Sequence, residues 1–411
     1  MKPTHWKLFS GPVTLVLAGS AVMPAANTWA GAIIAPESHM SSPASAGVGV
    51  PGIMSETTTQ AVQSRPARPV PLVSPEVHPD RRVTVRLQAP GAKEVTVWGD
   101  WGGAPAPLTR DAQGLWSTTL GPLPAEVYQY GFIVDGLRIP DLANPQGKPQ
   151  RSPTTSVFEI PGTPPLLHEF QEVPHGALHR HQYRSRPLRG LRPLVVYTPP
   201  GYGETSDRRY PVLYLFHGSG DSEGAWTVVG RAHLILDNLI AQKKARPMVI
   251  VMPDGHVSPP LPPAEASTRA LEAFEQDLLD EVVPFVEQHY RVRTDREHRA
   301  IVGLSMGGGQ ALTIGLRHRE RFAFVGGFSS AARSALEAAE AAYSEGSPAG
   351  GGLKLLWFAC GKDDRLLESN QQLDALLTRR GVHHEFHETE GNHSWPLWRK
   401  YLPLFVSRLF P

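Results

Sequence analysis

Residues 300–307 read AIVGLSMG, an apolar run that ends in a serine with glycine two residues before and two residues after it. The residues that follow, to about Arg317, have helical spacing. A strand that enters a helix through Gly-x-Ser-x-Gly is the context of a nucleophile elbow, in which the serine stands above the carboxyl end of the strand. Gly303 and Gly307 permit the tight turn, and the N-terminus of a helix that begins at Met306 directs free N–H groups and a positive dipole end to the same place. The stretch predicts a nucleophile at Ser305.

The chain around this stretch alternates between apolar runs and helical patterns, from about residue 173 to residue 411. Leu271, Phe274, Leu278, Val282 and Phe285 repeat every three or four residues, as one face of a helix does. The apolar runs are residues 193–197, 212–216, 248–252, 300–304, 322–328 and 355–359, followed by the less apolar 384–388. Apolar strands alternating with amphipathic helices predict a doubly wound α/β domain whose parallel sheet is covered on both faces.

A serine nucleophile needs a base and an acid partner for that base, and in this type of fold they follow in the order Ser, Asp or Glu, His. The run 355–359 leads into a turn that carries Asp363 and Asp364, at the strand end where catalytic groups gather. The strand-end rule does not separate these two neighbours.

The base is predicted to be His393, because it lies after the last strand on a loop beside Gly391. The chain has 17 histidines, so most of them do not take part in chemistry. His383, His384 and His387 lie within or beside the strand and are interpreted as structural or solvated.

Acyl transfer also needs hydrogen-bond donors for the oxyanion. Residues 212–216 lead into His217-Gly218-Ser219, the place where this fold supplies one such donor after an early strand. We expect the backbone N–H groups of Ser219 and Met306 to be the donors, and His217 to brace the loop. A simple turn is the alternative interpretation of His217-Gly218.

Other chemistries lack their motifs. The sequence has no His-Glu-x-x-His, no Cys-x-x-Cys, no Gly-x-Gly-x-x-Gly after a strand and no Walker loop, so neither a metal nor a cofactor is implied. Cys360 is the single cysteine, which excludes an intramolecular disulfide and thiolate clusters. With 40 Lys and Arg against 39 Asp and Glu, the charge gives no reason to expect nucleic acid or an anionic membrane as a partner.

Residues 1–30 have the layout of a cleavable export signal: Lys2 and Lys7, an apolar run over 11–23, and small residues before Ala30. The run is too short to span a bilayer, although a buried N-terminal helix is an alternative. We therefore expect export, with the periplasm and full secretion both open. Residues 31–75 are dominated by Ala, Ser, Pro, Gly, Thr and Val, which predicts a flexible linker.

Residues 76–162 contain short alternating strands separated by Gly- and Pro-containing turns, which predicts a small β-sandwich. Trp116 alternates in step with Leu120 and is expected in the core, whereas Trp98 is out of step with the neighbouring valines. Trp101 lies just past a strand in a Gly-rich turn and is the better candidate for stacking on a sugar ring. Trp98 is expected to cover a strand edge or pack on the next domain, if it does not itself contact sugar.

Three stretches of this segment, VTVWGDWGG, GLWSTTLGPLPAEVYQYGFIVDGLRIPD and NPQ, resemble the immunoglobulin-like early-set domains related to carbohydrate-binding module family 48. Such modules recur beside starch-active enzymes and plant-cell-wall esterases. The resemblance implies a polysaccharide without choosing the polymer.

Residues 173–411 resemble the esterase D/feruloyl esterase group, carbohydrate esterase family one, over nearly their whole length. The matching stretches, in order, are PHGALHRHQYRS, VVYTPPGY, YPVLYLFHGSGDSEGAW, VIVMPDGH, GLSMGGGQALTIGL, FAFVGGFSSA, ACGKDD and GNHSW. The resemblance implies an α/β-hydrolase fold, gives the acid role to Asp364 and the base role to His393, and places Trp226 against the acyl group. Core packing is the alternative for Trp226.

The group acts on feruloylated or acetylated xylan, and it also resembles siderophore (enterochelin-type) esterases and mycolyltransferases. The implied function is therefore a serine carboxylic-ester hydrolase acting on acylated polysaccharide. The alternatives are a siderophore or short-chain carboxylesterase, which the shorter N-terminal segment disfavours, and a noncatalytic glycan-binding protein. The acyl group and the oligomeric state stay open at this stage.

Overall fold

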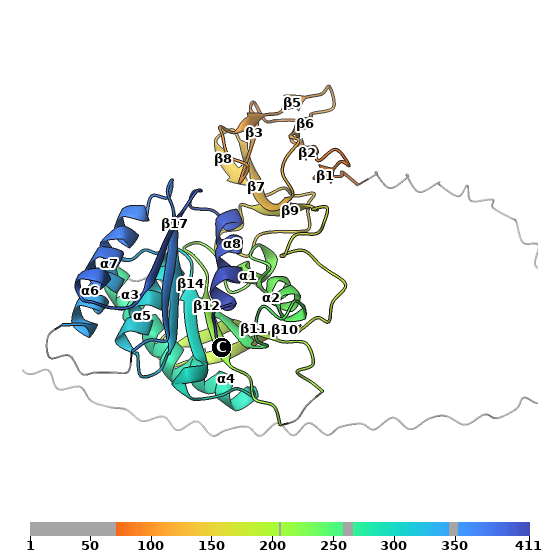
Figure 1. Ribbon diagram of the computed structural model, residues 1–411. Coiled ribbons are helices and arrows are strands. Elements are labelled where there is room, and N and C mark those ends of the chain that lie inside the picture. Colours follow the sequence, from red (N-terminus) through yellow and green to blue (C-terminus); the bar gives the residue numbers. More distant parts are fainter. Residues whose placement is uncertain (1–70, 205–206, 258–265, 345–351) are drawn as a thin grey trace, which may run out of the picture. The chain divides into compact units, whose positions relative to one another are not determined.

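The computed structural model describes residues 71–204, 207–257, 266–344 and 352–411 (Figure 1). They belong to one compact unit that spans Pro69–Pro411. The expected export signal and nearly all of the expected linker lie outside the described residues. Among the residues that are described, no helix is both long and apolar enough to cross a bilayer.

The N-terminal part of the described chain consists of two antiparallel sheets that share one core. One sheet has the order β1-β2-β6-β5, and the other has the order β4-β3-β7-β8 with β9 paired to β7. The first sheet contains β1 (Glu76–Val77), β2 (Val83–Gln88), β5 (Thr109–Arg110) and β6 (Leu115–Leu120). The second contains β3 (Val95–Gly99), β4 (Ala106–Pro107), β7 (Glu126–Val134), β8 (Leu137–Ile139) and β9 (Ser156–Ile160). This is a small β-sandwich, as the alternating pattern predicts.

The side chains of the sandwich follow the expected alternation between its two faces. Val85 and Val97 point into the shared core and are fully buried, while Trp98 is only half-buried and stacks under the guanidinium of Arg138. Trp116 is a buried member of the core.

The C-terminal part is built on an eight-stranded sheet with the order β10-β11-β13-β12-β14-β15-β16-β17 within the described residues. Its strands are β10 (Ala177–Ser185), β11 (Gly190–Thr198), β12 (Val212–Phe216), β13 (Val249–Pro253), β14 (Arg299–Gly303), β15 (Phe324–Phe328), β16 (Leu355–Gly361) and β17 (Glu385–Thr389). The strands from β12 to β17 run parallel to one another.

The predicted parallel sheet is extended at one edge by antiparallel strands. β10 pairs antiparallel with β11, and β11 pairs antiparallel with β13. The connection between β10 and β11 is only residues 186–189, which is too short for a crossover, so these strands form a hairpin. The sequence pattern missed β10 because its residues alternate between exposed and partly buried positions instead of forming an apolar run.

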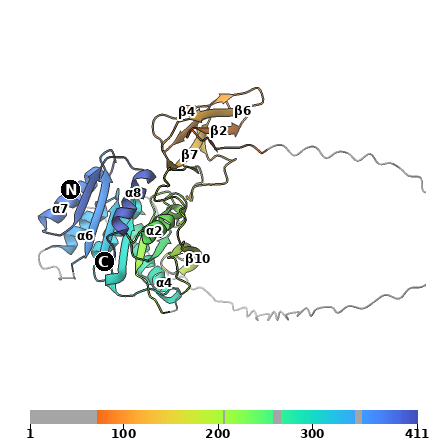
Figure 2. The ribbon, with the colours of Figure 1, turned by 45° about the vertical axis from the view of Figure 1, so that its right-hand side comes forward.

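Helices cover both faces of the sheet (Figures 1 and 2). Along β12, Leu213 and Leu215 contact one helical layer and Tyr214 and Phe216 contact the other, since successive strand residues point to opposite faces. The first layer holds α1 (Ala225–Val228), α2 (Ala232–Ala241) and α8 (Trp395–Val406). The second holds α3 (Ala266–Asp277), a π-helical turn (Leu278–Val282), α4 (Val283–His289), α5 (Met306–Arg317), α6 (Arg333–Ala342) and α7 (Leu367–Arg379). A 3₁₀ turn (Arg296–His298) precedes β14.

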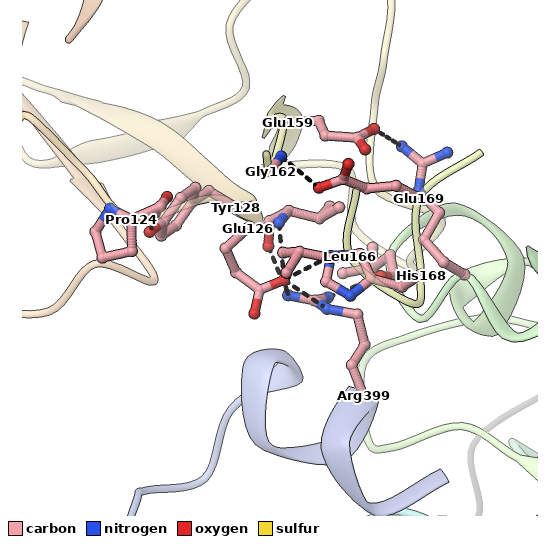
Figure 3. Close-up of polar contacts among 12 residues, drawn as sticks. Pro124, Glu126, Tyr128, Glu159, Gly162, Leu166, His168, Glu169 and Arg399 are labelled. Atoms are coloured by element: carbon pink, nitrogen blue, oxygen red, sulfur yellow. Dashed lines mark hydrogen bonds and ion pairs between the residues drawn. The ribbon is translucent and has the colours of Figure 1, made fainter. Parts of the chain in front are cut away.

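The sandwich and the α/β part share buried contacts. Val127 of β7 and Val157 of β9 belong to the apolar core that α1, α2 and α8 build on the sheet. Beside them the Arg399 guanidinium of α8, which is almost fully buried, donates to Glu126 Oε1 (3.0 Å) and to the carbonyl oxygen of Val127 (2.7 Å) (Figure 3). The third donor of this group reaches the carbonyl oxygen of Val229 (2.8 Å). The sandwich is thus packed on the sheet through α8.

Candidate active site

Ser305 lies between the end of β14 and the start of α5, with φ 53° and ψ −115°. A positive φ is costly for a residue that carries a Cβ atom, and tertiary contacts must hold it. They do so here, because Ser305 donates its N–H to Phe328 O (2.8 Å) and its carbonyl accepts the N–H of Ala331 (2.9 Å).

The glycines on either side of Ser305 are required by close backbone approach. A Cβ atom on Gly303 would lie 2.4 Å from the backbone of Gly307, and a Cβ atom on Gly307 would lie 2.3 Å from the carbonyl oxygen of His217. The turn therefore closes only with glycine at both positions. This close approach is the physical reason for the two glycines of the Gly-x-Ser-x-Gly motif.

His393 and Asp364 converge on this serine from the loops that follow β17 and β16. The distance from His393 Nε2 to Ser305 Oγ is 2.9 Å, and His393 Nδ1 lies 2.8 and 3.0 Å from the two oxygens of Asp364. This geometry places the ring proton on Nδ1, where it is donated to the carboxylate, and leaves Nε2 free to accept the serine proton.

The Asp364 carboxylate is buried and accepts several hydrogen bonds. Burial alone would raise its pKa, but the hydrogen bonds from His393, from the Leu366 N–H and from Ser329 outweigh burial and hold the pKa of Asp364 below its usual range. The neighbouring Asp363 is exposed, so the structure brings only one of the two aspartates to His393.

The other C-terminal histidines are engaged elsewhere. His384 Nε2 lies 2.8 Å from Asp374 Oδ1, and His387 Nε2 lies 3.5 Å from Glu385 Oε2. His383 is exposed. None of the three contacts Ser305.

The loop after β12 passes directly over the serine. A Cβ atom on Gly218 would lie 2.6 Å from Leu304 Cδ1 and 3.4 Å from Ser305 Cβ. His217 Nε2 accepts the N–H of Gly255 (2.9 Å), so its proton is on Nδ1, which donates to the carbonyl oxygen of Gly218 (2.8 Å). His217 therefore holds the loop to the end of β13, as the sequence predicts for a bracing residue.

A cavity of about 560 Å³ opens beside Ser305. Ser219 and Met306, whose N–H groups are the predicted oxyanion donors, both contribute to its wall. Met306 is the first residue of α5, so its N–H has no acceptor within that helix. The remaining lining residues are Gly255, His256, Val257, Ala270, Leu271, Gly309, Gln310, Ala331, Ser334, Arg365 and Leu366.

Trp226 does not line this cavity, which corrects the expectation that it contacts the acyl group. Its ring is 1% exposed, stands edge-on against Trp395 (5.0 Å between ring centroids), and donates its indole N–H to Phe216 O (2.9 Å). Residues 225–228 form α1, which turns this side chain into the core instead of toward the serine. The alternative interpretation, core packing, describes its position.

Trp101 is half-buried on the sandwich. Its ring packs near Tyr128 and Phe158, with centroids 6.3 and 6.2 Å away, and it also lines a second cavity of about 680 Å³ together with Asp100 and Arg399. The predicted glycan contact therefore lies at the junction of the two parts and lines a different cavity from the one beside Ser305.

Three residues of the cavity wall were not assigned roles from the sequence. His256 accepts the N–H of Gly220 (3.1 Å), and Gln310 donates to the carbonyl oxygen of Gly255 (2.9 Å). Burial lowers the pKa of His256 to about 4, so the ring is neutral and can accept this bond. Arg365, exposed at the rim, directly follows Asp364. In the sequence, His256 and Arg365 could have been noticed because they follow strands, and Gln310 because it lies in the helix after Ser305.

The residues described include no group of three or more His, Cys, Asp or Glu that could hold a metal ion. Ser305, His393 and Asp364 provide the site with a nucleophile and acid–base groups.

Comparisons with known proteins show which family the chain belongs to. A family model described as a putative esterase matches residues 185–409. An endo-1,4-beta-xylanase/feruloyl esterase of Xylanibacter ruminicola is 30% identical over 356 residues, which cover 84% of this chain and 47% of the relative. This chain thus spans about half the length of that curated relative.

Solved structures show the same fold. An enterobactin esterase from Shigella flexneri matches 79% of this chain and 92% of its own, with 21% identity and a TM-score of 0.58. A ferulic acid esterase from Anaeromyces mucronatus matches 59% of this chain and 94% of its own, with 23% identity and a TM-score of 0.52. The expected α/β-hydrolase fold is confirmed, and because the family model covers more than half of the sequence, the chain belongs to the esterase family.

Proposed function

We propose that this protein is a serine carboxylic-ester hydrolase that works through an acyl-enzyme. The observation that carries the proposal is the continuous set of contacts from Asp364 through His393 to Ser305 Oγ, at the wall of a cavity large enough for an aromatic or short acyl group. A serine hydroxyl is a weak nucleophile until a positioned base accepts its proton, and this set of contacts supplies both the base and the group that orients it.

In the first half of the reaction, Ser305 Oγ attacks the ester carbonyl while its proton passes to His393 Nε2. Asp364 stabilises the imidazolium by accepting the Nδ1–H bond, and its lowered pKa keeps the carboxylate ionised. The N–H groups of Ser219 and Met306 bind the oxyanion. The imidazolium then protonates the departing alkoxide, and Ser305 is left acylated.

In the second half, water takes the place of the alcohol. His393 Nε2 accepts a proton from that water, the hydroxide attacks the acyl carbonyl, and the same N–H groups bind the second oxyanion. Collapse of this intermediate returns the proton to Ser305 Oγ and releases the carboxylic acid.

The substrate class that we propose is plant cell-wall polysaccharide esterified with ferulate or acetate. Support comes from the X. ruminicola relative, whose name combines xylanase with feruloyl esterase and whose match extends over 84% of this chain. The sandwich with Trp101 is the part that we propose contacts the glycan, since an aromatic face packs well on a sugar ring.

The test is product analysis on feruloylated, acetylated arabinoxylan, with the purified chain beside its Ser305→Ala variant and with ferulate and acetate assayed separately. Release that Ser305→Ala lowers by a factor on the order of 10³ or more supports the proposal. Ferulate release identifies a feruloyl esterase, and acetate release alone identifies an acetylxylan esterase. Near-normal rates in the variant contradict the assignment of Ser305.

A second candidate is a siderophore or short-chain ester. Arg365 at the rim of the cavity favours this candidate, because a guanidinium would attract an anionic catecholate ester. A kcat/KM for a ferric catecholate ester that exceeds the value for methyl ferulate would place this substrate first.

We also propose export, on the charged, apolar and small-residue order of residues 1–30. N-terminal sequencing of the protein recovered from the producing cells and their medium tests this, and an uncleaved Met1 in all cell-associated material contradicts it.

A further inference from the structure

A segment of the sandwich reaches the loop that carries Ser219. Arg151 donates its N–H to the carbonyl oxygen of Gly220 (2.9 Å), and Ser222 donates its N–H to that of Pro149 (3.2 Å). Gln150 and Asp221 form the antiparallel bridge between these two bonds. The sandwich segment 148–151 thus pairs as a short strand with residues 220–222, which directly follow Ser219.

An ion pair reinforces this pairing. Lys148 Nζ lies 2.7 Å from Asp221 Oδ1, and the two side chains are only 12% and 6% exposed. Lys148 Nζ also lies 6.0 Å from the ring centroid of Trp395, two residues after His393. Breaking a buried pair by removing one partner leaves an uncompensated charge, so the pair fixes Asp221 strongly relative to the sandwich.

The loop is held from the opposite side by the α/β part. Gly220 donates its N–H to His256, and Gly218 packs against Leu304 and Ser305. Ser219 lies between these contacts. Its side chain is exposed and makes no hydrogen bond to another described residue. The position of its N–H therefore depends on the residues that flank it.

Segment 148–151 is held in place by hydrogen bonds and core contacts within the sandwich. Lys148 donates its N–H to Thr155 O (2.9 Å), which ties the segment to the start of β9. β9 and β7 are in turn anchored in the core through Val157 and Val127, and Arg399 bonds β7 to α8 (Figure 3).

We propose that the sandwich takes part in catalysis as a positioning element, with Lys148 acting through Asp221 to fix the oxyanion donor at Ser219. This inference rests on the proposed esterase function. Lys148 contacts no substrate and is a positioning residue. An oxyanion donor displaced by a fraction of an ångström binds the transition state less well while ground-state binding is little changed.

The test uses the full chain with Lys148→Met, Lys148→Arg and the double variant Lys148→Met/Asp221→Asn. Glu159→Gln is the matched control, because Glu159 pairs across the same junction with Arg231 (3.0 Å), the residue before α2, instead of with the Ser219 loop. For each protein, kcat and KM for 4-nitrophenyl acetate are measured, together with the inhibition constants of phenylboronic acid and of ferulate. The boronate forms a tetrahedral adduct on the serine and reports on the oxyanion donors, whereas ferulate reports on ground-state binding.

We expect Lys148→Met to lower kcat on the order of 10-fold to 100-fold with KM within about twofold. Boronate affinity should fall by a similar factor and ferulate affinity should not change. Lys148→Arg should restore kcat to within a few-fold, and Glu159→Gln should match the wild type. The double variant removes both charges and leaves none unpaired, so it should fold even where Lys148→Met does not, and it should show the same loss of kcat.

A double variant that keeps wild-type kcat, or that loses boronate and ferulate affinity equally, overturns the inference and leaves the esterase proposal intact. Failure of the wild type to show Ser305-dependent hydrolysis of any ester overturns both.

Discussion

His393 Nδ1 lies within 3.0 Å of both carboxylate oxygens of Asp364, which is buried, while the adjacent Asp363 is exposed. Replacing Asp364 with Asn should lower kcat by a factor on the order of 10⁴, because the amide would favour the ring tautomer whose Nε2 carries the proton and cannot accept one. Steady-state kinetics on an aryl acetate measure this effect. Asp363→Asn is the matched control and should stay within about twofold of the wild type; an equal loss in both variants would contradict the assignment.

We expect Gly307, in the turn at Ser305, to tolerate a side chain far less well than Gly203, which lies elsewhere in the chain. Gly307→Ala should abolish most activity and lower the free energy of unfolding by about 1–3 kcal/mol, because the new Cβ atom would meet the His217 carbonyl oxygen at 2.3 Å. Gly203→Ala should be close to neutral, since a Cβ atom there has nothing within 4 Å. Urea unfolding and activity of the two variants make the comparison, and a Gly307→Ala protein with normal activity would show that the turn can relax.

The position of Trp226 predicts an effect on stability and not on substrate choice. Trp226→Leu should lower the free energy of unfolding by about 3 kcal/mol or more, because it leaves a cavity in the core and removes the donor to Phe216 O. The ratio of kcat/KM for feruloyl and acetyl esters should not change. Leu271→Ala, which alters the cavity wall itself, should change that ratio. If Trp226→Leu changed the ratio of kcat/KM for feruloyl and acetyl esters without lowering stability, the result would support a contact between Trp226 and the acyl group.

His256 predicts a dependence of stability on pH. Its pKa falls from an ordinary 6.5 in the unfolded chain to about 4 in the folded protein, where burial disfavours the charged ring. Between these values the unfolded chain binds a proton that the folded chain does not, so this contribution to stability is present above about pH 6.5 and is lost as the pH falls toward 4.

The measurement is the free energy of unfolding in urea at several pH values across this window. His256→Gln, whose side-chain oxygen can also accept the Gly220 N–H, should show a shallower decline than the wild type. His383→Gln, a change at an exposed site, should follow the wild-type curve. Parallel curves for His256→Gln and the wild type would show that His256 is protonated equally in both states.

Much of the fold could be predicted because its signals are local. The strands from β12 to β16 appear as apolar runs since both faces of a parallel sheet are buried, and the glycines around Ser305 mark a turn that only glycine permits. β10 gave no such run because it lies at the sheet edge, where most of its residues are exposed or partly buried.

The sequence by itself therefore determined the two architectures, the serine at the elbow and the chain order of its candidate partners, because each depends on residues that are neighbours along the chain. The family resemblance favoured Asp364 over Asp363, and the structure shows that Asp364 is the aspartate that faces His393. Only the tertiary structure decided that Trp226 belongs to the core and that Arg399 reaches Glu126 from 273 residues away. It also decided that Lys148 of the sandwich pairs with Asp221 beside the predicted oxyanion donor. These relationships depend on how separate elements pack and which side chains are thereby removed from water, and no local pattern of residue types encodes such distances.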